Sequence, residues 1–164
     1  MKDGDFLDLD FSMVGSENLV IAMHGLEGSS ASKYMISACN YLNSKKMDVL
    51  ALNFRGCSGE DNLKLYSYNS GKSDDLYEVI AFVSDNYNYN NIFLLGYSMC
   101  VNIALKYLGE NSDVPKIIKG AVAISVPCDL EGSSHKLGKW YNKIYMAEFL
   151  KTLKKKSLSS KLRI

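Results

Sequence analysis

The feature that most constrains this chain is an apolar run that stops abruptly at a glycine and a serine. Residues 92–95 are apolar, which is typical of a buried strand, and Gly96-Tyr97-Ser98 follows them. Apolar residues then recur at the spacing of a helix face: Val101, Ala104, Leu105 and Leu108. A strand that becomes a helix within one or two residues must turn sharply at the serine. The sequence therefore predicts that Ser98 lies at a strained corner, with its hydroxyl above the sheet and the helix N-terminus beneath it.

Ser98 has two interpretations at this stage. In the first it is the nucleophile of a nucleophile elbow, which needs small residues two positions before and after the serine because larger side chains would crowd strand against helix. Gly96 meets this requirement, whereas Cys100 stands where a second glycine is usual. In the second interpretation Ser98 is an ordinary N-cap residue of the following helix. The segment alone leaves both open.

The rest of the chain alternates predicted strands and helices. Residues 7–13 alternate apolar and polar side chains, as in a half-buried antiparallel strand near a sheet edge. Residues 19–23 are apolar on both faces, as in a central parallel strand. Further strands are predicted at residues 49–54 and 121–126, with helices over residues 35–42, from Ser73 as N-cap, over residues 101–109 and from about Lys136 into the tail. This order predicts an α/β fold, a mostly parallel sheet with flanking helices.

Composition limits the class of protein. At 164 residues the chain is long enough for one domain with a real core, and 47% of it is apolar and 23% charged. No apolar run approaches the roughly 18 residues of a membrane span, and the acidic start does not resemble a signal peptide. The four cysteines are far apart and none has Cys-x-x-Cys spacing. We therefore expect reduced thiols, a cytoplasmic location and no metal site.

Charge is distributed unevenly along the chain. Residues 1–135 hold 10 basic and 17 acidic side chains, a net charge of −7, whereas residues 136–164 hold 9 basic and 1 acidic, a net charge of +8. A basic tail can contact nucleic acid or an anionic membrane surface. We expect a solvated helix face and no nucleic-acid partner, and we keep weak contact of the tail with a membrane surface as an alternative.

Reacting groups in a parallel sheet gather at the carboxyl ends of the strands. One such loop begins at His24. If Ser98 is the nucleophile of an elbow like that of the α/β-hydrolases, the backbone N–H groups of Leu26 and Met99 are expected, by that likeness, to hold the negative oxygen of a tetrahedral acyl intermediate. His24 could act as a general base, but it precedes these donors, so we expect its ring to anchor the loop. Arg55 and Glu60 flank two glycines, and we expect an internal ion pair or loop anchor there, with substrate contact as the alternative.

Several motifs occur in order along the chain. They are His24-Gly25-Leu26-Glu27-Gly28-Ser29-Ser30 with Ser32 and Tyr34, Asn53-Phe54-Arg55-Gly56-Cys57-Ser58-Gly59-Glu60, Tyr68-Asn69-Ser70-Gly71 before Asp74-Asp75-Leu76, Gly96-Tyr97-Ser98 with Asn102, and Pro127-Cys128-Asp129-Leu130. From about residue 3 to about residue 150, the chain resembles the YheT-like branch of the AB hydrolase superfamily. The resemblance implies an α/β-hydrolase fold and a serine esterase of the carboxylesterase or lipase type. It implies Ser98 as the nucleophile, Leu26 and Met99 as oxyanion donors, small-molecule or lipid esters with short to medium acyl chains as substrates, and no metal or organic cofactor.

The family pattern requires groups that follow later strands. A serine needs a base to take its proton, and the base needs a carboxylate to orient it. We therefore expect residues 1–164 to form a single partial α/β-hydrolase domain that lacks the C-terminal strands, the lid and a strand ahead of residue 3. Its activity is then impaired, because the triad acid and histidine are absent. A relay of Asp129 and His135 is the alternative within the chain, and both are otherwise interpreted as loop residues.

Two other hypotheses remain beside the enzyme. The chain could be a non-catalytic truncated remnant that acts as a binding or interaction module. In either case strand 121–126 would lie at an open sheet edge, and we expect self-association through it. The chain could instead be a doubly wound nucleotide-binding protein whose loop 25–30 holds phosphate. That loop lacks Gly-x-Gly-x-x-Gly spacing and a Walker lysine, so we favour the hydrolase.

Overall fold

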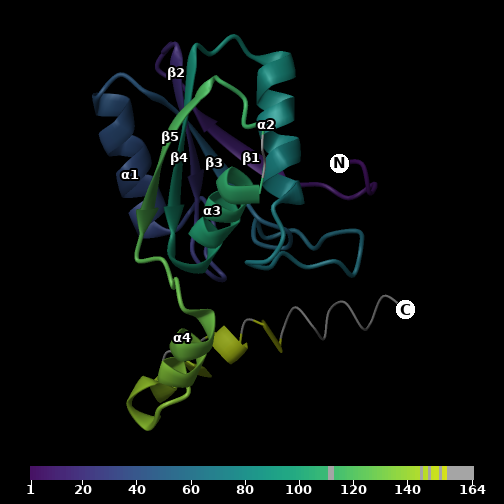
Figure 1. The fold of residues 1–164 in the computed structure, drawn as a ribbon, viewed down its shortest axis with the longest axis vertical. Coiled ribbons are helices and arrows are strands. Elements are labelled where there is room, and N and C mark those ends of the chain that lie inside the picture. The colour runs from purple at the N-terminus through teal and green to yellow at the C-terminus, as the bar shows by residue number, and fades with distance from the viewer. Residues whose placement is uncertain (111–112, 145, 148, 152, 155–164) are drawn as a thin grey trace. The chain divides into compact units, whose positions relative to one another are not determined.

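The computed structural model describes residues 1–110, 113–144, 146–147, 149–151 and 153–154 (Figure 1). The chain divides into two compact units, Met1–Val126 and Pro127–Ile164. The first contains β1 (Asp8–Ser12), β2 (Asn18–Met23), α1 (Lys33–Ser44), β3 (Asp48–Asn53), α2 (Asp74–Asn86), β4 (Asn91–Tyr97), the 3₁₀ helix η1 (Ser98–Cys100), α3 (Val101–Glu110) and β5 (Ile118–Ile124). The second contains α4 (Leu130–Leu137) and the 3₁₀ helix η2 (Trp140–Asn142). The single partial domain over residues 1–164 stays a prediction.

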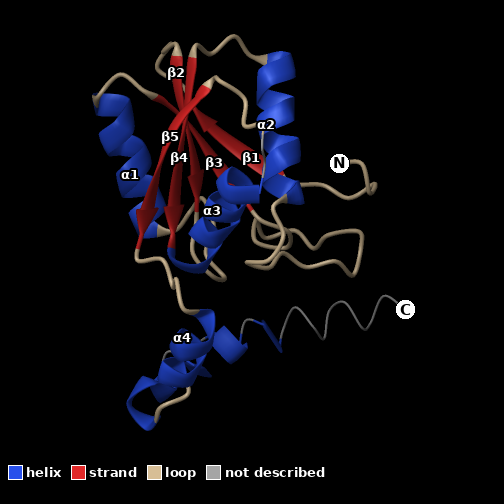
Figure 2. Ribbon diagram, viewed as in Figure 1, coloured by secondary structure: helices blue, strands red, loops and turns tan. Residues whose placement is uncertain are grey.

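The strands form one sheet in the order β1-β3-β2-β4-β5 (Figure 2). β3, β2, β4 and β5 are parallel neighbours, and β1 joins the edge antiparallel to β3. The register places Met23, at the end of β2, opposite Gly96 of β4. Because the two strands run in the same direction, the residues that follow them leave the sheet at neighbouring points. This pairing is what brings the loop at His24 next to the turn at Ser98.

Apolar side chains are buried on both faces of the sheet. On one face the larger cluster joins alternate residues of β2 and β3 to α2 and α3 through Val79 and Ile103, among others. On the other face Met35 of α1 packs against Ala22 of β2 and its neighbours in β3. Helices therefore cover both faces (Figure 2), and β2 is buried on both, as its continuous apolar sequence predicts.

The elements predicted for the first unit are confirmed, with shifts at their ends. The edge strand is antiparallel, as the alternation in residues 7–13 predicts. β5 runs from Ile118 to Ile124 rather than over residues 121–126, because its ladder with β4 begins at Ile118 and Ser125 has φ 55°. Ser73 does precede α2, but its φ of −106° and ψ of 0° are not the extended conformation of a capping residue, and its side chain makes no capping hydrogen bond. Ser73 is thus the N-cap residue of α2 by position, as predicted, and its carbonyl accepts from the N–H of Tyr77 at 2.9 Å, but its side chain does not cap the helix.

The helix expected from Lys136 begins earlier, at Leu130. Its N-cap is Asp129, whose carboxylate accepts a hydrogen bond of 2.9 Å from the N–H of Gly132. α4 ends at Leu137 and η2 begins at Trp140, so the predicted start of this helix was wrong. The described residues 143–144, 146–147, 149–151 and 153–154 are helical, as predicted for the tail. Residues 145, 148, 152 and 155–164 of the expected helix lie outside the described residues.

β5 forms an edge of the sheet in the part of the chain that the structure describes, and its side chains are largely exposed. Val122 is 57% exposed and Ile124 38%. This is the open edge that the sequence predicts, and pairing of β5 with a second copy stays a prediction. Among the described residues, no helix combines the length and the apolar character needed to cross a membrane.

Candidate functional site

Two loops meet at the carboxyl ends of β2 and β4. One follows β2 and contains residues 24–28, and the other is the turn of residues 96–101, which we call the β4 turn. A Cβ built on Gly25 would lie 3.3 Å from Cβ of Ser98 and 3.5 Å from the carbonyl oxygen of Tyr97. The absence of a side chain at Gly25 therefore lets the loop backbone touch the serine.

Ser98 occupies the corner between strand and helix. Its φ of 55° is in the left-handed region, which costs a non-glycine residue of order 1–3 kcal/mol. β4 ends at Tyr97, η1 begins at Ser98, and α3 begins at Val101. The side chain of Ser98 is exposed. The strained, accessible serine that the sequence predicts is thus confirmed as a conformation, while its role as nucleophile stays a prediction.

Close packing holds the β4 turn. A Cβ on Gly96 would lie 2.6 to 2.9 Å from three atoms of Val101, including Cα, so only glycine fits. Cys100, at the position where a second glycine is usual, points into the core and is fully buried. Burial raises the pKa of the Cys100 thiol, with smaller contributions from Cys57 and Glu27. The Cys100 side chain is therefore packed in the apolar core, and its buried thiol stays protonated.

Most backbone N–H groups of the loop after β2 donate hydrogen bonds to other groups of the protein. Five N–H groups have internal acceptors: Gly25 donates to Tyr34 Oη (2.9 Å), Glu27 to Tyr68 Oη (2.9 Å), Gly28 to the carbonyl of Gly25 (3.0 Å), Ser29 to Ser32 Oγ (3.0 Å) and Ser30 to Asn53 Oδ1 (2.8 Å). Within the described residues, the N–H of Leu26 has no such acceptor. A loop that held phosphate would need several free N–H groups, so this geometry disfavours the nucleotide hypothesis.

Met99, the residue after Ser98, offers a second donor. It lies in the first turn of η1, where a backbone N–H has no acceptor within the helix. The side chains of Leu26 and Met99 both pack against the larger apolar cluster. The two N–H groups named by the sequence therefore belong to the two loops that meet at Ser98. Their action on an oxyanion stays a prediction.

His24 is fully buried, and both of its ring nitrogens are in use. The N–H of Phe54 donates to Nε2 at 3.2 Å, and Nδ1 lies 2.7 Å from the carbonyl oxygen of Gly25. A backbone N–H can only donate and a carbonyl can only accept, so Nε2 is unprotonated and Nδ1 carries the proton. The ring anchors the loop, as expected, and this geometry does not support His24 as a general base.

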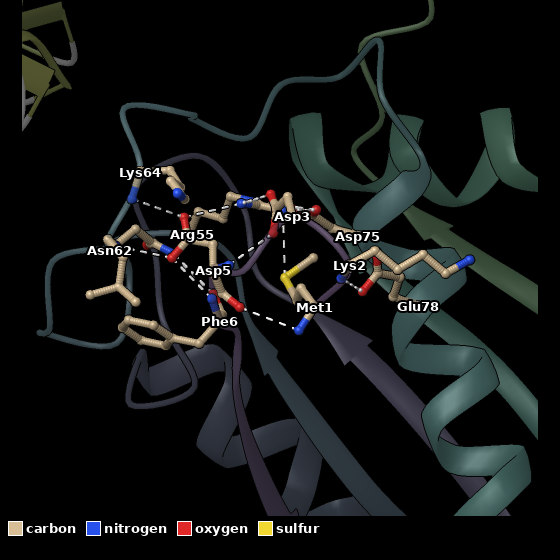
Figure 3. A network of polar contacts seen from close by, with 11 residues as sticks. Met1, Lys2, Asp3, Asp5, Phe6, Arg55, Asn62, Lys64, Asp75 and Glu78 are labelled. Atoms are coloured by element: carbon tan, nitrogen blue, oxygen red, sulfur yellow. Dashed lines mark hydrogen bonds and ion pairs between the residues drawn. The ribbon is translucent and has the colours of Figure 1, made fainter.

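Arg55 is buried and forms the centre of a polar cluster (Figure 3). Its Nε and Nη2 make a bidentate pair with Asp75, and its Nη1 lies 3.1 Å from Asp5 and 2.7 Å from Asp3. Hydrogen bonds to Asp75 raise the pKa of Arg55 above its already high value, so the guanidinium stays charged. The loop-anchor prediction for Arg55 is confirmed.

Glu60 is not the partner of Arg55. The loop turns twice between them, at Gly56 and Gly59, which both have positive φ, and Glu60 is exposed. The partners of Arg55 come instead from the N-terminal segment and from the start of α2. The Arg55–Glu60 pair was therefore a wrong prediction.

Asp129 and His135 belong to the second unit; Asp129 lies in the bend just before α4, as a loop residue, whereas His135 is a helix residue and the loop interpretation was wrong for it. Asp129 caps α4, and His135 lies inside α4 with Nε2 at 3.7 Å from Glu131. The loop interpretation missed the helix because the expected start lay six residues too late. An Asp129–His135 relay stays an untested alternative. Among the described residues, no three His, Cys, Asp or Glu side chains are grouped to hold a metal ion.

Two tyrosines hold the loop after β2, and the sequence did not predict these roles. Tyr34 accepts from the N–H of Gly25, and Tyr68 accepts from the N–H of Glu27 and donates to the Glu27 carboxylate at 3.1 Å. Both are separated in sequence from the loop they hold, and neither lies in a spacing that signals chemistry. The only signal was their presence in the motif series that carries the family resemblance.

Comparison with known proteins gives the family. Residues 15–163 match the Hydrolase_4 family, described as serine aminopeptidase, S33. The chain is 30% identical to YheT of Escherichia coli (strain K12), covering 94% of this chain and 46% of that protein, and 28% identical to a monoacylglycerol lipase of Saccharomyces cerevisiae, covering 71% and 26%. The chain thus spans about half the length of YheT, and less of the lipase.

Solved structures agree with the fold. Esterase Pf2001 of Pyrococcus furiosus is 27% identical, with a TM-score of 0.70 over 90% of this chain and 57% of that one. An α/β serine hydrolase homologue from Coxiella burnetii, 20% identical with a TM-score of 0.62 over 82% and 68%, supports the fold alone. The sequence resemblance and the predicted fold are confirmed. The chain belongs to the Hydrolase_4 family, within the esterase- and lipase-type α/β-hydrolases.

Proposed function

We propose that this chain carries the nucleophile and the oxyanion hole of a serine esterase, with Ser98 as nucleophile and the N–H groups of Leu26 and Met99 as donors. One observation carries the proposal: in the loop that touches Ser98, the N–H of Leu26 has no acceptor among the residues that the structure describes. Catalytic hydrogen bonds need donors that are fixed in place and not already used. The substrates are carboxylic esters, small-molecule or lipid, with short to medium acyl chains.

The reaction follows from these positions. Oγ of Ser98 forms a bond to the acyl carbon and gives its proton to a base, while the carbonyl oxygen becomes negative between Leu26 and Met99. The ester C–O bond then breaks and the alcohol leaves with a proton, which gives acyl-Ser98. Water attacks this ester in turn and releases the carboxylic acid. The left-handed φ of Ser98 supports the nucleophile-elbow interpretation, because that motif holds its serine in a strained turn.

The proposal assigns no base within the described residues. The sequence holds two histidines; His24 has both nitrogens engaged, and His135 lies in α4 with Glu131. Without an acid–histidine pair, an oxyanion hole and substrate binding alone leave roughly 10³- to 10⁴-fold acceleration over water. We therefore expect slow acyl transfer by this chain alone, through a partial α/β-hydrolase domain. A cytoplasmic location and self-association through β5 complete the proposal, and weak contact of the basic tail with a membrane surface is kept as the alternative to a solvated helix face.

A second candidate is a non-catalytic module. A protein that only binds needs neither a free histidine base nor a glycine at position 100. Both ring nitrogens of His24 are engaged and the buried Cys100 stands in place of that glycine, which favours this candidate. This candidate has the same fold, but its Ser98 is unreactive.

Labelling with a fluorophosphonate separates the two candidates. The reagent phosphonylates an activated serine with loss of fluoride, and mass spectrometry of the digest locates the label. Because the proposal assigns no base, we expect slow labelling at Ser98 that Ser98→Ala abolishes and that Ser58→Ala, at an exposed serine of another loop, leaves unchanged. A folded chain that stays unlabelled would contradict the esterase proposal and favour the binding module.

A further inference from the structure

We infer that His24 and Tyr34 are positioning residues that hold the two peptide groups on either side of Gly25 and thereby aim the N–H of Leu26. The catalytic consequence rests on the proposed function, whereas the geometric one does not. His24 holds the peptide after Gly25, and Tyr34 holds the peptide before it. Neither side chain has to touch the substrate for this role.

The peptide between Gly25 and Leu26 is held through its carbonyl oxygen. The C=O of Gly25 and the N–H of Leu26 belong to the same planar trans peptide and point in opposite directions. The Nδ1–H of His24 donates to that carbonyl at 2.7 Å, and the N–H of Gly28 donates to it at 3.0 Å. Two donors on one oxygen fix the plane of the peptide. The direction of the Leu26 N–H is fixed with it.

The ring of His24 is in turn fixed by its surroundings. It is fully buried, it accepts from the N–H of Phe54 at 3.2 Å, and the Phe54 ring contacts it edge-on with a centroid separation of 5.3 Å. Because Nε2 has to accept, the proton must sit on Nδ1, where it faces Gly25. Phe54 comes directly before Arg55, the centre of the buried cluster. The tautomer of His24 is therefore set by the end of β3 and not by solvent.

The peptide between His24 and Gly25 is held by Tyr34. Its N–H donates to Tyr34 Oη at 2.9 Å. A Cβ on Gly28 would lie 2.7 Å from this oxygen, so the absence of a side chain at Gly28 makes the room that the phenol occupies. The ring of Tyr34 contacts that of Tyr97, with centroids 4.8 Å apart. Tyr34 thus links the loop after β2 to the residue that precedes Ser98.

Two substitutions of His24 separate the bond to Gly25 from the bond to Phe54. In His24→Asn the amide nitrogen can replace Nδ1 as donor to Gly25, whereas in His24→Gln the amide oxygen can replace Nε2 as acceptor from Phe54. We expect His24→Asn to react with fluorophosphonate at close to the wild-type rate. His24→Gln should react about 10- to 100-fold more slowly, because a misaimed donor loses part of what one oxyanion donor supplies. Tyr34→Phe should be slower as well, and Tyr41→Phe, an exposed tyrosine on the same helix, should be unchanged.

A readout that needs no activity runs beside the labelling. We expect the amide signal of Leu26 in nitrogen-15 NMR spectra to move in His24→Gln and Tyr34→Phe but not in His24→Asn. Long-range spectra of the imidazole should show the proton on Nδ1. If both His24 variants lose reactivity in proportion to their melting temperatures, or if the ring proton sits on Nε2, the inference is wrong. If the wild type does not label at all, the esterase proposal fails, and the Leu26 signal still decides the positioning role.

Discussion

The site is built from two regions that are held in different ways. The loops after β2 and β3, residues 24–28 and 54–68, are held by polar side chains: His24 binds Phe54, Tyr68 binds Glu27, and Arg55 binds three aspartates. The β4 turn is held by contact between Gly96 and Val101 and by the burial of Cys100. The two loops depend on hydrogen bonds and ion pairs, whereas the β4 turn depends on close packing of its side chains and backbone.

The difference predicts different weaknesses. A buried hydrogen bond or ion pair fails when one partner is removed, because the other partner is left desolvated. A close-packed turn tolerates polar changes nearby but fails when atoms are added. The polar loops also draw partners from distant parts of the chain, from Asp3 to Asp75, whereas the contact between Gly96 and Val101 lies within the six residues of the β4 turn. Substitutions can test each half of this comparison separately.

The largest effect is expected at Arg55 in the polar region. Arg55→Met leaves Asp3, Asp5 and Asp75 together without their cation, and breaking a buried pair in this way costs about 3–5 kcal/mol of unfolding free energy. Urea denaturation followed by circular dichroism measures the loss. Arg55→Lys is the matched control and should lose less, because it keeps the charge but not the bidentate geometry. A loss under about 1 kcal/mol for Arg55→Met would show that the cluster does not hold this region.

The next effect is expected in the β4 turn. Gly96→Ala places a methyl group 2.6 to 2.9 Å from atoms of Val101, including its backbone, and should cost about 1–3 kcal/mol. Gly109→Ala is the control in the adjoining helix, where an added Cβ meets nothing within 4 Å, and it should stabilise the protein by about 0.5–1 kcal/mol. Equal effects at the two glycines would contradict the packing account of the turn. Thermal unfolding of both variants decides the matter.

The same contrast explains which parts of the structure the sequence predicts. The β4 turn was predicted together with the strain at Ser98, because an apolar run, a glycine and a helical repeat within residues 92–108 determine it. The partners of Arg55 were not predicted, since Glu60 is its neighbour in sequence whereas Asp75 is its neighbour in space. Contacts between residues far apart depend on the strand order, which local periodicity does not reveal. The family resemblance supplied Tyr34 and Tyr68 only as members of a motif, without their roles.

A smaller effect is expected when one polar contact is removed and its volume kept. Tyr68→Phe removes the acceptor of the Glu27 N–H and the donor to its carboxylate, and should cost about 1–3 kcal/mol. Tyr66→Phe is the control: it keeps the ring that lies 4.6 Å from the guanidinium of Arg55 and should change stability by less than about 0.5 kcal/mol. If the two variants behave alike, ring packing rather than hydrogen bonding holds Glu27.

Acid should weaken the polar region before the β4 turn. Burial alone would raise the pKa of Asp5, but the hydrogen bonds that it accepts lower the pKa below its ordinary value. The unfolded chain, with a pKa of about 3.9 for this group, therefore binds the proton first as the pH falls. The contribution of Asp5 to stability is complete above about pH 4 and is lost as the pH falls through the folded value.

Amide hydrogen exchange can follow this loss region by region. The N–H groups of Leu63 and Lys64 donate to Asp5, so we expect their protection, corrected for intrinsic exchange, to fall over the acid interval that begins at about pH 4. Ile103 in α3 has only apolar packing to lose and should keep its protection over that interval. Asp5→Asn should have lower protection at neutral pH and a weaker acid dependence at both amides. If the acid dependence is the same in both regions, or unchanged in Asp5→Asn, charge does not distinguish them, and the polar loops and the β4 turn unfold as one unit.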